Sequence, residues 1–286
     1  MLGTAAQPTI ESEIERYLRT GETDPCLTAW SGGFMERAQR AHSDLRCALV
    51  DAVKRLAEGL AHASLPVADT VSLTRSLVEL MVRGLLPRAE QEPVLTMLER
   101  SVVFLTSANI ERVLMEESFD SSAWDLANLY LASLGAELLG EEAPQIVGLN
   151  EETTCFVSPA YFVEDDPFAD FIVHEAAHIF HNCKRATVGL QETRKKEWLL
   201  DIEFSKRETF ACSCEAYSRI LQRGKTVAER RALAAEYGRS LQISDERTNA
   251  EEVAEIVAAA AAARNGWKVI LARCAPIPRR ARATAR

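Results

Sequence analysis

The segment from residue 171 to residue 182 constrains the fold more than any other part of the chain. It reads Phe-Ile-Val-His-Glu-Ala-Ala-His-Ile-Phe-His-Asn. On an α-helix, His174 and His178 lie one turn apart on the same face, so both imidazoles can reach one metal ion while Glu175 projects beside it. The neighbouring residues are apolar and include no proline, as expected for a helix buried inside a domain. The sequence therefore predicts a buried helix with one metal-binding face.

Local signals place the ends of this helix. Asp166 supplies an N-cap acceptor, and Pro167 follows it at the first helical position. We expect the helix to run from about Pro167 to about His181. The alternative interpretation is a buried helix whose histidines are satisfied by hydrogen bonds alone.

Residues 174–178 also match the H-E-x-x-H pattern of zinc metalloproteases. A catalytic zinc takes three protein ligands and keeps a fourth position for water, so one further donor is needed. Glu208 and Glu215 are the candidates, and they share one face of a predicted helix. Because they lie about 10 Å apart along the helix axis, only one of them can bind the same ion.

The order of elements, a hairpin, an H-E-x-x-H helix and a glutamate-bearing helix, resembles the gluzincin group of metallopeptidases over about residues 145–222. In that group the third ligand commonly begins a Glu-x-x-Ala or Glu-x-Phe-Ala run, and residues 208–211 read Glu-Thr-Phe-Ala. The resemblance therefore implies zinc as the cofactor and Glu208 as the third ligand, with Glu215 as the alternative. Cys212 departs from the group, because an acidic residue often follows the ligand there.

His181 has two consequences for the interpretation. The metzincin pattern requires glycine at this position and a histidine at position 184, which is lysine here, so that class is excluded. His181 also lies two turns from His174, too far to bind the same ion. We expect His181 to be a hydrogen-bond partner of the site or to line the wall of the cleft. Binding of a second metal ion by His181 is the minor alternative.

These features predict a zinc-dependent metallopeptidase that hydrolyses peptide bonds of a protein or peptide substrate. Zinc lowers the pKa of bound water towards about 7 and polarises a carbonyl. Glu175 would take the proton of the attacking water and pass it to the leaving amine. Tyr217 and Tyr161 are candidate donors to the oxyanion, with packing in the core as the alternative for each. The other hypothesis is a helical binding or regulatory protein with a non-catalytic zinc site.

Composition narrows the class of protein. The chain has 286 residues, of which 47% are hydrophobic and 26% charged, as in an ordinary globular protein. Its net charge of −9 argues against a nucleic-acid or anionic-membrane binder. No stretch approaches the length of a membrane span and no secretory signal begins the chain, so we expect a cytoplasmic protein. Seven cysteines without a paired framework suit free thiols.

The predicted fold is mainly α with a small antiparallel β element, an α+β arrangement. We expect a helical domain over residues 1–120, a zincin-like domain over 121–275 and a basic, disordered tail over 276–286. The boundary is placed in the polar segment 118–122. Residues 145–149 and 153–157 are rich in β-branched side chains and predict an antiparallel hairpin. Asp69 and Asn249 are expected to begin helices, and Gly21, Gly224 and Gly266 to end them.

Overall fold

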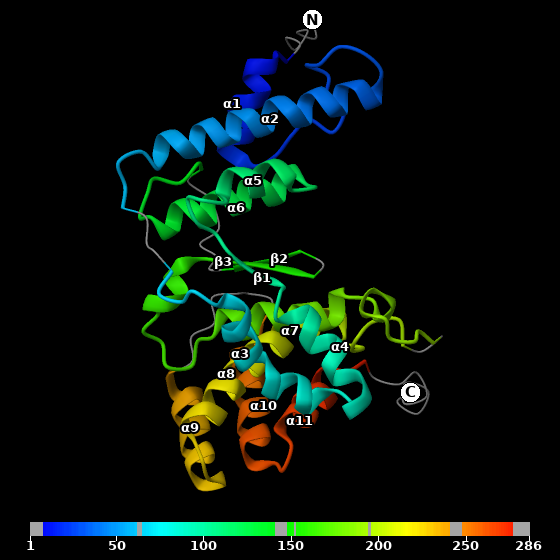
Figure 1. Cartoon of the computed structure of the whole chain (residues 1–286), viewed down its shortest axis with the longest axis vertical. Helices are drawn as coiled ribbons and strands as arrows, with labels where there is room; N and C mark the ends of the chain where they lie inside the picture. Colours follow the sequence, from blue (N-terminus) through cyan, green and yellow to red (C-terminus); the bar gives the residue numbers. More distant parts are fainter. Residues whose placement is uncertain are drawn as a thin grey trace, which may run out of the picture. The chain divides into compact units, whose positions relative to one another are not determined.

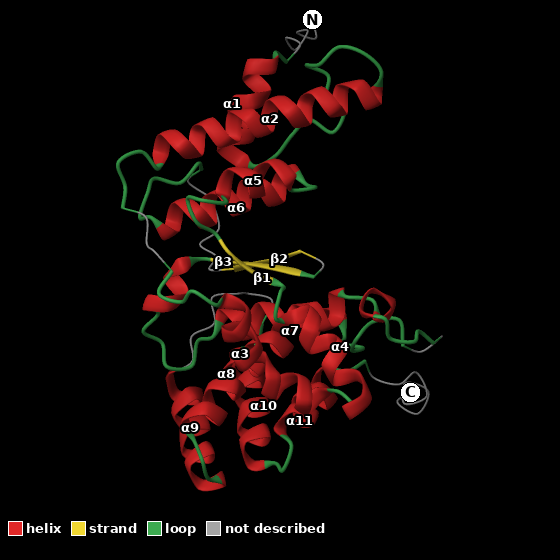
Figure 2. Ribbon diagram, viewed as in Figure 1, coloured by secondary structure: helices red, strands yellow, loops and turns green. Residues whose placement is uncertain are grey.

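The computed structural model of the chain describes residues 8–61, 65–140, 148–151, 153–193, 196–240 and 248–276. The basic tail from residue 277 onwards and residues 145–147 of the predicted hairpin lie outside the described residues. The described part is mainly helical and contains one small sheet (Figures 1 and 2). The prediction of a mainly helical chain is therefore confirmed.

The chain divides into two compact units, and neither is continuous in sequence. The first comprises Met1–Pro66, Phe104–Leu149 and Ser158–Phe162. The second comprises Val67–Val103, Asn150–Val157 and Val163–Arg286. A boundary near residue 120 therefore does not match this division, because residues 118–122 lie within the first unit.

The first unit is built from helices that pack around a long one. Its helices are α1 (Ile10–Thr20), α2 (Phe34–Leu56), α5 (Ile110–Glu116) and α6 (Asp120–Ser133). Helix α2 packs against α1, α5 and α6 (Figure 1). Leu45 and Leu49 of α2 are fully buried, as the apolar spacing of this segment predicts. Gly21 ends α1 with φ of 72°, as the sequence indicates.

Arg46 explains why residues 118–122 do not separate two domains. This side chain is fully buried and donates from Nε to Oδ1 of Asp120 at 2.8 Å. Its two terminal nitrogens donate to the carbonyls of Leu114 and Glu117 at 2.8 and 3.0 Å. One guanidinium of α2 thus donates hydrogen bonds to carbonyls at the end of α5 and to a carboxylate in the first turn of α6. The predicted boundary is therefore a short connection between two helices of the same unit.

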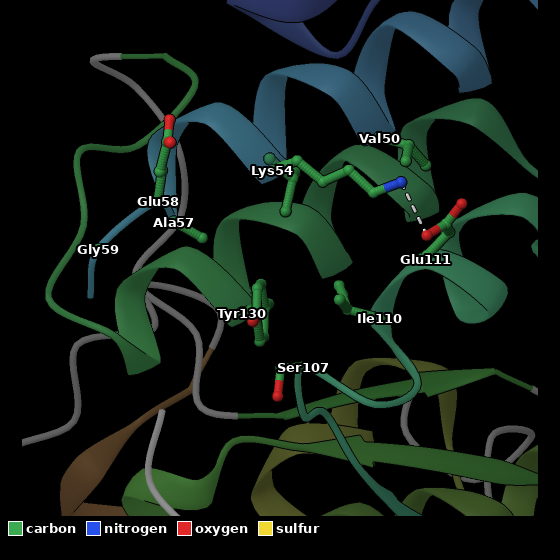
Figure 3. A pocket seen from close by; sticks show the side chains of 10 residues that line it. Val50, Lys54, Ala57, Glu58, Gly59, Ser107, Ile110, Glu111 and Tyr130 are labelled. Carbon is green, nitrogen blue, oxygen red and sulfur yellow. Dashed lines mark ion pairs between the residues drawn. The ribbon is translucent and has the colours of Figure 1, made fainter. Parts of the chain in front are cut away.

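A cavity of about 280 Å³ lies in the first unit between α2, α5 and α6 (Figure 3). Val50, Val53 and Ile110 give it apolar walls. An ion pair between Lys54 and Glu111, 2.8 Å long, spans it from α2 to α5. The cavity contains none of the residues of the H-E-x-x-H segment.

The second unit holds the H-E-x-x-H segment and is organised around helix α8. Helix α8 packs against α3, α7, α9, α10 and α11. Helix α7 lies against α8, α3 and strand β3. The helices of this unit are α3 (Thr70–Leu85), α4 (Arg88–Leu98), α7 (Phe171–Asn182), α8 (Arg207–Arg223), α9 (Val227–Ser240), α10 (Ala250–Ala262) and α11 (Gly266–Cys274).

The sheet differs from the predicted hairpin. It has three strands, β1 (Val102–Phe104), β2 (Gly148–Glu151) and β3 (Thr154–Val157), in the order β1-β3-β2. It contains a parallel pairing of strands, so the prediction of a purely antiparallel element is wrong. The cause is β1, a strand that the sequence did not predict. A parallel pair needs a long crossover connection, and the chain between β1 and β3 provides one.

Two helix ends also differ from the sequence prediction. Helix α7 begins after Asp170, whose carboxylate accepts from the Val173 N–H at 3.3 Å, whereas Asp166 accepts from the Phe168 N–H at 2.8 Å in the turn before it. Gly266 begins α11 instead of ending α10.

Other caps are as predicted. Asp69 accepts from the Ser72 N–H at 2.9 Å at the start of α3, and Asn249 accepts from the Glu252 N–H at 3.1 Å at the start of α10. Gly224 ends α8. Within the described residues, no helix combines the length and the apolar character needed to cross a membrane.

Candidate metal centre

Three side chains from α7 and α8 converge on one point. Nε2 of His174 lies 3.3 Å from Nε2 of His178. Oε2 of Glu208 lies 3.6 Å from the first of these atoms and 3.5 Å from the second. Ligands that share one tetrahedral zinc at about 2.0–2.1 Å lie about 3.3–3.4 Å from one another. The three atoms therefore form a triangle close in size to that of three ligands on one metal ion.

The helix geometry explains this convergence. His174 and His178 are four residues apart on α7, which places both rings on the face towards α8. Glu208 lies in the first turn of α8, immediately after the short 3₁₀ turn Phe204–Lys206. Ala176, Ala177 and Phe180 of α7 and Phe210 and Ala211 of α8 are fully buried, so apolar packing fixes the two helices that carry the polar atoms.

Glu215, the alternative third ligand, lies on the other side of the His174 ring. Its Oε2 is 3.0 Å from Nδ1 of His174, and its Oε1 accepts from the Asp170 N–H at 2.7 Å. A ring that donates from Nδ1 presents the lone pair of Nε2 to a metal. Both glutamates therefore belong to the site, but the structure brings only Glu208 to the metal-binding atoms.

His178 has a partner of a different kind. Its Nδ1 lies 3.0 Å from Nε2 of His181, and Nδ1 of His181 lies 2.9 Å from Oδ1 of Asn182. His181 is 4% exposed. Burial, followed by the nearby charge on His178, lowers the pKa of His181 to about 3. The ring is therefore a neutral neighbour of the site, as its distance from His174 in the sequence led us to expect.

The carboxylates give the site an affinity for cations. Burial acts to lower the pKa of His174, but hydrogen bonds with Cys212, Glu208 and Glu215 raise it well above its usual value. Hydrogen bonds with His174 and His178 lower the pKa of Glu208. Positive charge at this position is thus stabilised, whether it is carried by a proton or by a metal ion.

Glu175 lies beside the triangle and is nearly buried, at 9% exposed. Burial is the main cause that raises the pKa of its carboxyl group. The three side chains of the triangle retain some exposure, 19% for His174, 12% for His178 and 27% for Glu208. The three potential ligand atoms are thus partly open to solvent, and a carboxylate lies next to them.

Tyr217 does not belong to this arrangement. Its ring is buried and packs edge-on against Trp267, with ring centroids 4.9 Å apart. Its hydroxyl accepts from the Gly266 N–H at 3.2 Å. A Cβ atom on Gly266 would lie 2.3 Å from Cζ of Tyr217, so glycine is needed at the start of α11 for this close approach. We therefore correct the predicted oxyanion role of Tyr217 to packing between α8 and α11.

Tyr161, the second tyrosine considered, belongs to the first unit. Its ring contacts those of Phe104 and Phe162, with centroids 6.2 and 5.2 Å away. These contacts assign it to an aromatic cluster of that unit.

Asp170 and the orienting role of Glu215 were not predicted. Asp170 is fully buried, begins α7 and also donates its N–H to Glu215. The spacing of seven residues between Glu208 and Glu215 was the available signal, because it places two carboxylates on one helix face, two turns apart. That spacing allows one carboxylate at each nitrogen of His174.

No protein-family model, curated protein or solved structure matches this chain at a significant level.

Proposed function

We propose that the chain is a zinc-dependent metallopeptidase of the gluzincin type, with a zincin-like catalytic region in the second unit. The observation that carries this proposal is the triangle of His174, His178 and Glu208 with Glu175 beside it. The interatomic distances of 3.3–3.6 Å support zinc as the ion that these three residues would hold.

Zinc bound there would polarise a substrate carbonyl and make water a better nucleophile at neutral pH. Glu175 is the general base of the proposal, because it follows one ligand directly and is not part of the triangle. Its raised pKa makes the carboxylate more basic, which suits a group that accepts the proton of the attacking water. The same carboxyl group can then donate that proton to the leaving amine, and the sum of these steps is hydrolysis of an amide bond.

A non-catalytic zinc site in a helical binding protein is the alternative. Such a site has no use for a general base, and zinc sites of that kind are closed by four protein ligands. Among the described residues, the structure gathers three potential ligands here, and they are partly exposed. This observation favours the enzyme over the binding protein.

The substitution Glu175→Gln separates the two functions. Glutamine keeps the size of the side chain but removes its basicity, so we expect folding and zinc content to survive. Cleavage of a natural protein or peptide substrate should fall by about 10²–10⁴-fold or more. Zinc content is measured on the same samples, and His174→Ala serves as the control that loses the ion. Full activity of Glu175→Gln on a substrate that the wild type cleaves would contradict the peptidase proposal.

A further inference from the structure

The hydrogen bonds around α7 form a chain that leads from the metal centre to the end of the helix. They join His178 to His181 at 3.0 Å and His181 to Asn182 at 2.9 Å. All three residues lie in the last five positions of α7. His181 is therefore held by both of its ring nitrogens, which is unusual for a residue whose only task is to fill space.

The direction of these hydrogen bonds follows from the metal centre. If His178 binds through Nε2, its proton is on Nδ1, so His178 is the donor to His181. Nε2 of His181 must then be unprotonated, and the proton of a neutral imidazole is on Nδ1. That proton points at Oδ1 of Asn182, which can only accept. The Nδ1–H groups of both histidines thus meet an acceptor.

We infer that His181 and Asn182 are positioning residues that fix the tautomer and the ring orientation of His178, so that Nε2 is presented to the ion. The inference rests on the proposed metal centre and deepens it. The carboxylate of Glu215, 3.0 Å from Nδ1 of His174, orients that ring in the same way. The two ligand histidines are therefore held by partners of different charge, one anionic and one neutral.

The difference in charge has a consequence for the ion. A carboxylate partner makes a ligand imidazole more basic and a stronger electron donor than a neutral partner does. Glu208 and Glu215 already bring two negative charges to the centre. A neutral partner at His178 orients the ring without adding a third, which preserves the positive character that a Lewis acid needs.

Metal affinity tests the inference without reference to activity. His181→Leu removes the acceptor, and we expect zinc affinity, measured by competition with a chelator, to fall by about 10–100-fold. His181→Gln is the conservative variant, because its amide oxygen can reach the position of Nε2 and accept from His178. It should restore affinity to within a few-fold of the wild type. Equal affinity of the wild type and His181→Leu would overturn the inference.

A second substitution tests whether the residues act in series. Asn182→Ala alone should weaken zinc binding, because it frees His181 to adopt the other tautomer. Combined with His181→Leu, Asn182→Ala should cause no further loss of zinc affinity, since the hydrogen bonds from His178 to Asn182 are already interrupted. Additive losses in the double variant would show that Asn182 acts elsewhere and would overturn the serial arrangement.

The tautomers can also be read from the unsubstituted protein, which removes any doubt about folding of the variants. In the zinc-loaded chain, ¹⁵N NMR of the imidazoles should show protons on Nδ1 of His174, His178 and His181. A proton on Nε2 of His181 would overturn the inference while leaving the metal centre intact. Conversely, full activity of Glu175→Gln with these tautomers present would contradict the proposed function alone.

Discussion

Glu215 contacts His174 through the ring nitrogen opposite to the one that faces Glu208. Its carboxylate lies 3.0 Å from Nδ1, whereas Oε2 of Glu208 lies 3.6 Å from Nε2. Two carboxylates of one helix thus hold one imidazole from both sides. This relationship favours Glu208 over Glu215 as the third ligand of the proposed metal centre, because Glu215 is occupied by His174 and by the Asp170 N–H.

Substitution of the two glutamates should have different effects on metal binding. Glu208→Gln removes a proposed ligand, and we expect loss of stoichiometric zinc. Glu215→Gln leaves the three ligands in place but presents an NH₂ group to one of its two donors, so zinc affinity should fall by about 10–100-fold. Chelator competition and metal analysis measure both. A stronger loss in Glu215→Gln than in Glu208→Gln would reverse the assignment.

Tyr217→Phe should leave the proposed activity unchanged, because the hydroxyl accepts from Gly266 and packs away from solvent. The expected cost is about 1 kcal/mol of unfolding free energy, for the lost hydrogen bond. Activity and urea denaturation are measured on the same preparation, next to Glu175→Gln. A large loss of activity at unchanged stability would return Tyr217 to the catalytic machinery.

Arg46 should be essential for the stability of the first unit. Arg46→Met leaves two backbone carbonyls without their donor and leaves the carboxylate of Asp120 with His42 alone, and we expect a loss of about 2–4 kcal/mol. Arg112 is the matched control, since it makes an exposed pair with Glu116 at 2.8 Å and its substitution should cost about 0–0.5 kcal/mol. Chemical denaturation followed by circular dichroism compares the two. Equal losses would contradict the role of Arg46.

The pair of Glu90 and Arg185 should make stability depend on pH. Arg185 is buried and donates to both carboxylate oxygens, at 2.8 and 3.1 Å, which lowers the pKa of Glu90. The stabilisation is therefore complete above the unfolded value of about 4.3 and is lost as the pH falls through the lower folded value. Glu90→Gln should cost about 2 kcal/mol at neutral pH.

Urea denaturation of the wild type and Glu90→Gln at pH 7 and at pH 3 measures this dependence. The difference between the two proteins should shrink at the lower pH. Glu197, whose side chain is 53% exposed and paired with Lys184, gives a control that should show little effect at either pH. A stability difference between the two proteins that grows on acidification would contradict the predicted direction of the pH dependence.

Local signals in the sequence were sufficient to place His174 and His178 on one helix face and to locate the starts of several helices. The spacing of His174 and His178 fixes their common face, and capping side chains such as Asp69 and Asn249 mark helix starts, because both depend only on neighbours along the chain. The role of Glu215 depends on how α7 and α8 pack, which no local pattern encodes. Gly266 shows the same limit, since its closeness to Tyr217 across two helices determines why glycine is there.

The sequence did not predict strand β1, because its pairing also depends on contacts that are distant along the chain. Residues 102–104 are three apolar residues beside helical segments, and so short a run does not distinguish a strand from a helix. Its partner β3 lies far along the chain, so the pairing is a property of the fold as a whole. The division into two units does not follow the predicted boundary near residue 120, because the buried contacts of Arg46 with residues 114–120 are likewise long-range.

The pairing of β1 with β3 has a consequence for the order of folding. The N–H of Cys155 donates to the Ser101 carbonyl at 2.7 Å, so this contact closes the loop that contains α5 and α6. The entropic cost of closing a loop grows with its length, and contacts within the loop that form earlier shorten its effective length. Helix α7 packs on β3. We therefore expect α5 and α6 to acquire hydrogen-exchange protection before β3, and the histidine-bearing helix to become protected last.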